Sequence, residues 1–122
     1  MKAGVAIYSN NVILLVFQKA SKCWSIPKGH TNDNESSSAC WRRELNEETG
    51  LKYIPCGVIH EKQLFFQGYS ITTIKIHNDK LLPQVRPGDH DEIAVARWVS
   101  FDELTRLPLN GVTANVVDKL AL

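Results

Sequence analysis

The sequence predicts an α/β fold in which a mixed β-sheet lies between helices, an α/β/α sandwich. Three observations predict it. Short apolar or alternating stretches bounded by turn residues occur on both sides of one long helical segment. That segment, residues 36–49, places small or apolar side chains on one face only. Two short helical segments follow the last strand-like stretch. A chain of 122 residues can bury one sizeable core, so we expect a single domain over residues 1–122.

The first quarter of the chain contains two predicted strands. Residues 3–8 alternate and are mostly apolar, and residues 12–18 form a second apolar stretch. Serine and asparagine at positions 9–11 predict a turn between them. Residues 19–23 favour a loop, and Pro27 indicates extended backbone before the long helix.

The long helix has recognisable ends. Three serines, Ser36, Ser37 and Ser38, are candidates for its N-cap, and Gly50 suits its C-cap. Trp41 lies within it and is either a half-buried core residue or an exposed contact residue; the sequence leaves both open.

The second half of the chain alternates strands with turns and ends in helices. Residues 57–66 and 70–77 are predicted strands joined by a hairpin turn at 67–69. Residues 78–91 are polar and include Pro83 and Pro87, which predicts a long loop of the kind that is often functional. The remaining predictions are a strand at 92–99, a capping box from Ser100 to Glu103 that opens a short helix ending before Pro108, and a last helix from Asn110 to Leu120.

The long helix also carries a cluster of carboxylates. Positions three and four apart are neighbours on a helix, so Glu44, Glu47 and Glu48 fall within an arc of about 100°. Clustered negative charges destabilise an isolated helix, but they suit a hard divalent cation such as Mg²⁺. Arg43 precedes the cluster and can orient one carboxylate by a bidentate pair, and Gly29 allows backbone to approach a metal or phosphate closely.

Residues 29–51 resemble the signature motif of the Nudix hydrolase family, the Nudix box. The surrounding order of elements agrees with the family along nearly the whole chain. The resemblance implies a Nudix-type α/β/α sandwich with a mixed sheet and a metal-dependent hydrolase. The defined positions of the motif are Gly29, Glu35, Arg43, Glu44, Leu45, Glu47, Glu48, Gly50 and Leu51.

The resemblance also implies a set of metal ligands. Glu47 and Glu48 would hold Mg²⁺ or Mn²⁺, and Glu44 would either join them or pair with Arg43. The backbone carbonyl of Lys28 often completes the metal shell in the family. The family counterpart of Glu35 is usually structural, so we do not expect it to be a ligand.

The same resemblance suggests residues for chemistry and substrate binding. Residues 92–98 are similar to a late strand that often carries a further glutamate six positions before a tryptophan, which nominates Glu92 as general base or metal ligand. Asp89 and Asp91 are its local rivals, and Glu44 or Glu47 could be the base instead. Lys28 and His30 are candidate phosphate contacts.

The implied reaction is hydrolysis of a pyrophosphate bond in a nucleoside diphosphate linked to another moiety. Residues 24–30 look like the approach to the box in diadenosine-tetraphosphate hydrolases and mRNA-decapping Nudix enzymes, which favours a dinucleoside polyphosphate or a capped or triphosphorylated RNA 5′ end. One alternative is an enzyme that removes oxidised nucleoside triphosphates. Another is a catalytically silent domain that senses a nucleotide.

Composition excludes several other classes. The formal net charge is only +1, and no basic run or DNA-binding motif is present, which argues against a dedicated nucleic-acid-binding module. The apolar run at 12–17 is too short to span a membrane. The three cysteines, Cys23, Cys40 and Cys56, are odd in number and lack metal-ligand spacing. We therefore expect a cytoplasmic, reducing location without membrane partners.

Overall fold

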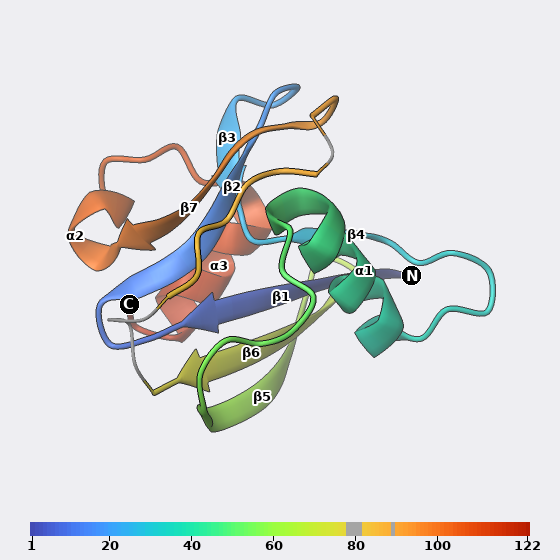
Figure 1. The fold of residues 1–122 in the computed structure, drawn as a ribbon, viewed down its shortest axis with the longest axis horizontal. Coiled ribbons are helices and arrows are strands. Elements are labelled where there is room, and N and C mark those ends of the chain that lie inside the picture. Colours follow the sequence, from blue (N-terminus) through green and yellow to red (C-terminus); the bar gives the residue numbers. More distant parts are fainter. Residues whose placement is uncertain (78–81, 89) are drawn as a thin grey trace.

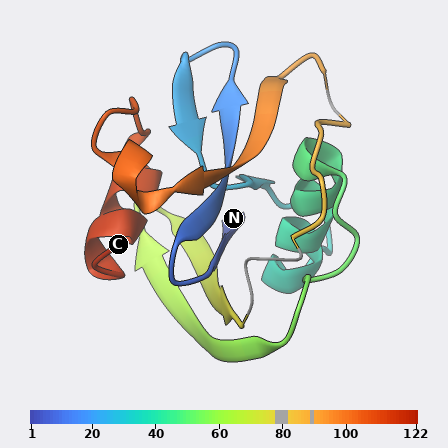
Figure 2. The ribbon, with the colours of Figure 1, turned by 60° about the vertical axis from the view of Figure 1, so that its left-hand side comes forward.

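The predicted sandwich is confirmed by the computed structural model (Figure 1). Figure 2 shows α1 on one side of the sheet and α2 and α3 on the other. The structure describes residues 1–77, 82–88 and 90–122, and within these residues the chain forms seven strands and three helices. The elements are β1 (Lys2–Tyr8), β2 (Val12–Gln18), β3 (Cys23–Ser25), β4 (Lys28–His30), α1 (Ser37–Thr49), β5 (Val58–Phe66), β6 (Tyr69–Ile76), β7 (Ile93–Ser100), α2 (Phe101–Leu104) and α3 (Gly111–Lys119).

The sheet is mixed because β1 pairs with β6 in parallel, whereas the other pairings are antiparallel. Its main order is β3-β2-β1-β6-β5, with β4 added to β1 and β7 added to β2. β1 pairs with β4 along its first residues and with β2 at Tyr8 and Ile13. β4 therefore lies beside the N-terminal half of β1, on the side away from β6.

Each face of the sheet has its own core. Ala3, Val5 and Ile7 of β1 pack in the cluster beneath α1, together with Trp41 and Leu45 of that helix. The alternate residues of β1, such as Ala6 and Tyr8, pack on the opposite face toward α3. This alternation follows from the two-residue period of a strand, and it means that neighbouring residues of β1 and β4 face opposite layers.

Helix α1 begins and ends where the sequence indicates. The Ser36 side chain accepts a hydrogen bond from the backbone N–H of Ala39, at 3.1 Å. At the other end Gly50 adopts a left-handed conformation with φ of 79°, and its N–H donates to the carbonyl of Asn46 at 2.9 Å. Trp41 is only 2% exposed, so of the two open interpretations it is a core residue.

Three predictions about local structure were wrong. Cys23, predicted as the end of a loop, begins the short strand β3, which pairs with β2, and residues 28–30 form the short strand β4, which was not predicted and pairs with β1. Tyr69 belongs to β6, and the hairpin turn is the two-residue Gln67–Gly68 turn with φ of 51° and 82°. At the start of α2, Ser100 does not accept a helix N–H; its hydroxyl instead donates to the Glu103 carboxylate at 3.3 Å.

The predicted long loop is fastened to α1. Backbone N–H groups of Arg86 and Gly88 donate to the carbonyls of Thr49 and Glu47, at 3.1 and 2.9 Å. Trp98 of β7 holds the same segment by donating from Nε1 to the carbonyl of Pro83 at 3.0 Å. Among the described residues, no helix combines the length and the apolar character needed to cross a membrane.

Candidate active site

The candidate site forms where β4 passes along α1. Gly29 of β4 faces the helix, and a Cβ atom at this position would overlap the carboxylate of Glu44. The absence of a side chain at Gly29 leaves room for that carboxylate in its observed position against the strand. The close approach of β4 to Glu44 therefore has a direct steric basis.

Glu48 is the most deeply placed carboxylate of the cluster, with 3% of its surface exposed. Its Oε2 accepts a hydrogen bond from the backbone N–H of Lys28 at 3.3 Å. Its Oε1 is buried and has no hydrogen-bond partner among the described residues. Burial raises the pKa of Glu48 well above its usual range, and the neighbouring Glu44 raises it further. A buried oxygen of this kind needs either a proton or a cation.

Arg43 joins three carboxylates of the motif. Its Nε and Nη2 atoms donate to the two oxygens of Glu35 at 2.9 and 3.0 Å, which is a bidentate pair. Its Nη1 atom donates to Glu44 at 3.0 Å and lies 3.3 Å from Glu47. Nη2 also donates to the backbone carbonyl of His30 at 2.9 Å. One guanidinium thereby fixes the end of β4 relative to α1.

The ion pair with Arg43 shifts the pKa of Glu35. The Arg43 hydrogen bond, together with one from the backbone N–H of Asn32, lowers the pKa of Glu35 to about 2. The same contacts raise the pKa of Arg43 further above its usual range. Glu35 is thus an anion that holds Arg43, and Arg43 in turn holds Glu44.

The donor set fits a hard divalent cation. Glu44 and Glu48 offer carboxylate oxygens beside the backbone of Lys28, and the partnerless Oε1 of Glu48 is available to a cation. Across the described part of the chain, however, no three acidic, histidine or cysteine side chains are already gathered as a metal-binding group. The Glu47 side chain is 45% exposed and turned to Arg43, so it would have to reorient to become a ligand.

The backbone and the side chain of Lys28 contact different groups. While its N–H meets Glu48, its Nζ donates to the hydroxyl oxygen of Tyr69 at 3.2 Å. Lys2 also lies against Tyr69, with its Nζ 4.8 Å from the ring centroid. Sequence reasoning missed this cluster, because nothing in the sequence indicates that β1 and β6 pair in parallel and bring Lys2 beside Tyr69.

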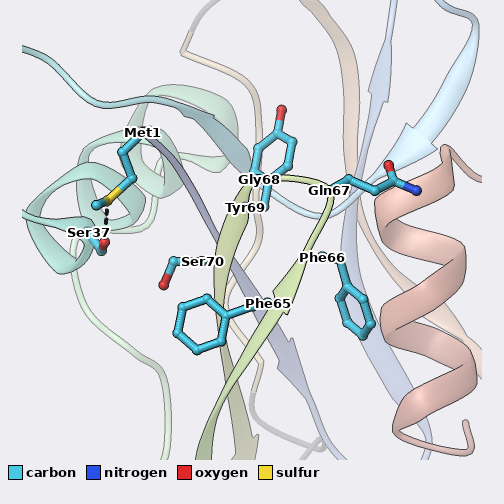
Figure 3. Close-up of a pocket in the computed structure, with 8 residues that line it drawn as sticks. All are labelled: Met1, Ser37, Phe65, Phe66, Gln67, Gly68, Tyr69 and Ser70. Atoms are coloured by element: carbon cyan, nitrogen blue, oxygen red, sulfur yellow. Dashed lines mark hydrogen bonds between the residues drawn. The ribbon is translucent and has the colours of Figure 1, made fainter.

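A hollow of about 520 Å³ opens at the β5–β6 hairpin next to Tyr69 (Figure 3). Met1, Ser37, Phe65 and Ser70 contribute to its lining, and Phe65 is 75% exposed. Figure 3 shows the Tyr69 ring directed away from the two phenylalanines that precede the turn. The His30 side chain is exposed at the end of β4.

Glu92 lies immediately before β7 and is exposed. Its carbonyl accepts a hydrogen bond from the backbone N–H of Lys19 at 2.9 Å. Together with Asp91, Gln18 and Ser21 it lines a separate hollow of about 200 Å³. The lining of this hollow does not include the glutamates of α1. The other rival, Asp89, lies outside the described residues.

Comparison with known proteins agrees with this fold. The model of the NUDIX domain matches residues 1–120. A putative hydrolase, 111R, of Invertebrate iridescent virus 3 is 40% identical over 76 residues, which are 62% of this chain and 44% of that protein. The m7GpppN-mRNA hydrolase of Saccharomyces cerevisiae is 32% identical over 112 residues, which are 84% of this chain and 11% of the yeast protein.

A solved structure is similar over nearly its whole length. The C. elegans Ap4A hydrolase in a binary complex superposes with a TM-score of 0.68 and 18% identity, covering 99% of this chain and 96% of that one. By contrast, the chain spans less than half the length of the curated relatives it matches.

Proposed function

The chain belongs to the Nudix family, and from this premise we propose that it is a divalent-metal-dependent pyrophosphohydrolase. Its substrate would be a nucleoside diphosphate linked to another moiety. The observation that carries the proposal is the buried Glu48 carboxylate, with one oxygen on the Lys28 N–H and the other without a hydrogen-bond partner among the described residues. A merely structural glutamate at this depth would have both oxygens satisfied.

The ligands of the cation would be Glu44, Glu47, Glu48 and the backbone carbonyl of Lys28, with Mg²⁺ or Mn²⁺ as the ion. When bound, the cation would neutralise phosphate charge and lower the pKa of the attacking water. Arg43 Nη1 donates a hydrogen bond to Glu44 at 3.0 Å. Glu44 would therefore bind the cation while still accepting this hydrogen bond. Glu35 keeps Arg43 in position for this.

The reaction would proceed by attack of water on one phosphorus of the pyrophosphate linkage. A bond forms between the water oxygen and phosphorus, and the bond from that phosphorus to the bridging oxygen breaks. The proton of the water passes to a carboxylate base, for which Glu92 is our candidate because the α1 glutamates would be committed to the cation. The departing phosphate takes the bond electrons. Lys28 and His30 would contact the phosphates that are not attacked.

Within this class we favour a dinucleoside polyphosphate or a capped or triphosphorylated RNA 5′ end. The support is the approach sequence at residues 24–30 and the similarity to an m7GpppN-mRNA hydrolase. A pyrophosphatase that removes oxidised nucleoside triphosphates is the second candidate, since the same carboxylate cluster would serve it. A silent nucleotide-sensing domain is the third, although the intact Glu44, Glu47 and Glu48 argue against it.

A substrate panel tests the proposal. The full chain would be incubated with diadenosine tetraphosphate, capped RNA, triphosphorylated RNA, ADP-ribose and an oxidised nucleoside triphosphate, each with Mg²⁺, Mn²⁺ or excess chelator. We expect cation-dependent cleavage of at least one compound, with products identified by mass. Nucleotide binding without turnover under every condition would support the sensing domain instead.

A further inference from the structure

Three side chains on the sheet face opposite α1 form a cluster of which the proposed reaction uses only Lys28. Lys28 of β4, Lys2 of β1 and Tyr69 of β6 come from three adjacent strands. The register places them on one face, because Lys2 is the partner of Tyr69, and Lys28 lies opposite Gly4, two residues along β1 from Lys2. All three are half-buried.

Tyr69 holds both ammonium groups. The Nζ atoms of Lys2 and Lys28 lie 4.8 and 4.9 Å from the centroid of its ring. The Tyr69 hydroxyl oxygen also accepts the hydrogen bond from Lys28 Nζ at 3.2 Å. Cation–π contacts of this length attract each ammonium to the ring. They do not neutralise it.

The two ammonium groups are like charges that share one aromatic ring. Each ion pair among the described residues involves Arg43 or Arg97, and neither Lys2 nor Lys28 takes part in one. An anion that joined the two ammonium groups would offset their mutual repulsion. A phosphate would accept charge-assisted hydrogen bonds from both.

The cluster is also connected to the carboxylates. Lys28 donates from its backbone to Glu48 and from its side chain to Tyr69. This one residue therefore connects the glutamates of α1 to the cluster around Tyr69. An anion held by the lysines would lie across β4 from the carboxylates that would hold the cation, with Lys28 in contact with both groups.

We propose that Lys2, Lys28 and Tyr69 form a phosphate-binding subsite for the part of a polyphosphate chain beyond the bond that is cleaved. Lys2 is a direct phosphate contact, and Tyr69 is a positioning residue that keeps both ammonium groups in place. The subsite rests on the proposed function, because it takes the phosphates of that substrate. It favours substrates with three or more consecutive phosphates over those with two.

The test measures binding and turnover with the full chain. Inorganic tripolyphosphate is titrated calorimetrically in Mg²⁺, and KM and kcat are measured for diadenosine tetraphosphate and ADP-ribose. For Lys2→Gln we expect about tenfold weaker tripolyphosphate binding, the effect of losing one charge-assisted contact. KM for the tetraphosphate should rise similarly while kcat and the KM for ADP-ribose change by less than about twofold.

Three further variants separate charge, positioning and structure. Lys2→Arg keeps the charge and should restore most of the binding. Tyr69→Phe loses only the hydroxyl bond to Lys28, whereas Tyr69→Leu loses both ring contacts and should weaken binding more. Lys62→Gln removes an exposed lysine of the neighbouring strand β5 and should match the wild type.

The outcomes distinguish this subsite from the function it serves. Tripolyphosphate binding that depends on Lys2 in a protein that cleaves nothing would support the subsite and overturn the proposed activity. Cleavage with Lys2→Gln indistinguishable from Lys62→Gln would support the activity and overturn the subsite. A fall in kcat at unchanged KM would also overturn it.

Discussion

At the scale of single residues, the three glutamates of α1 share one helix face but not one environment. Glu48 is buried against the Lys28 backbone, and Glu44 lies against Gly29, where a Cβ atom would overlap its carboxylate. Glu47 is far more exposed and turned to Arg43. Because their surroundings differ, substitutions at the three positions should have unequal effects, with Glu48 the least replaceable.

Replacing Glu48 by glutamine should nearly abolish activity while the fold is retained. Glutamine keeps the shape of the side chain and loses the anion that would attract the cation. We expect a loss on the order of 10³-fold in kcat/KM, or about 4 kcal/mol of transition-state stabilisation. Steady-state kinetics with the preferred substrate, alongside thermal unfolding, would measure it. Glu61→Gln on exposed β5 is the matched control, and full turnover by Glu48→Gln would refute the metal site.

Glu92→Gln distinguishes a base from a metal ligand. A base acts mainly in the transition state, so kcat should fall much more than KM rises, and the acidic limb of the pH–rate profile should change. A ligand variant would instead be partly rescued by more Mg²⁺ or Mn²⁺. Profiles recorded at two metal concentrations separate the two roles. If Glu92→Gln retains wild-type rates throughout, attention moves to Asp91 and Asp89.

The Glu35–Arg43 pair predicts a pH-dependent contribution to stability. The folded-state pKa of Glu35 is lowered to about 2, below the value of an unpaired glutamate. The stabilising contribution is therefore complete above the unfolded pKa and is lost as the pH falls toward 2. The difference in unfolding free energy between wild type and Glu35→Gln should be largest near pH 6 and shrink below about pH 4.

Denaturant unfolding at several pH values would measure that difference. Glu61→Gln is the control, because none of the ion pairs within the described residues includes Glu61. A gap between wild type and Glu35→Gln that stays constant from pH 6 to pH 3 would mean that the ion pair does not contribute to stability.

Helical periodicity predicted that Glu44, Glu47 and Glu48 share one helix face, since that depends only on positions three and four apart. It could not predict that Arg43 binds Glu35, Glu44 and Glu47 at once, because Glu35 precedes the helix and its position depends on the turn after β4. Nor could it predict the direction of the Lys28 side chain. That direction depends on the register of β4 against β1.

At the scale of elements, the sequence predicted every long strand and helix to within a few residues. The two strands it missed, β3 and β4, are three residues each. So short a stretch carries no measurable alternation, and its strand conformation comes from the neighbour to which it is hydrogen-bonded. The strand that faces the candidate site, β4, therefore has a conformation that its own sequence specifies only weakly.

Trp24 on β3 should matter for stability more than for catalysis. It is 9% exposed and meets Phe17 edge-on, with ring centroids 5.3 Å apart. Removing a buried aromatic side chain leaves a cavity, so Trp24→Ala should cost about 3–5 kcal/mol of unfolding free energy. Trp24→Phe, which retains most of the volume, should cost much less. Unchanged thermal stability with a strongly raised KM would instead make Trp24 a substrate contact.

At the scale of the whole molecule, β1 joins the two halves of the structure. Its residues alternate between the core beneath α1 and the core beside α3, and it contacts β2, β4 and β6. The sandwich itself could be predicted from the order of elements. The parallel pairing of β1 with β6 could not, because β2, β3, β4, α1 and β5 all separate the two strands in the chain.

The attachment of residues 86 and 88 to the carbonyl end of α1 has a consequence for synthesis of the protein. The carbonyls of Glu47 and Thr49 receive these hydrogen bonds only after Arg86 and Gly88 have left the ribosome. A nascent chain that has already produced all the glutamates of α1 therefore still lacks part of the framework that holds them. Assembly of the site is therefore completed only after residues well beyond its own motif have been translated. A truncated translation product ending before residue 86 would contain the motif but lack these two hydrogen bonds to α1.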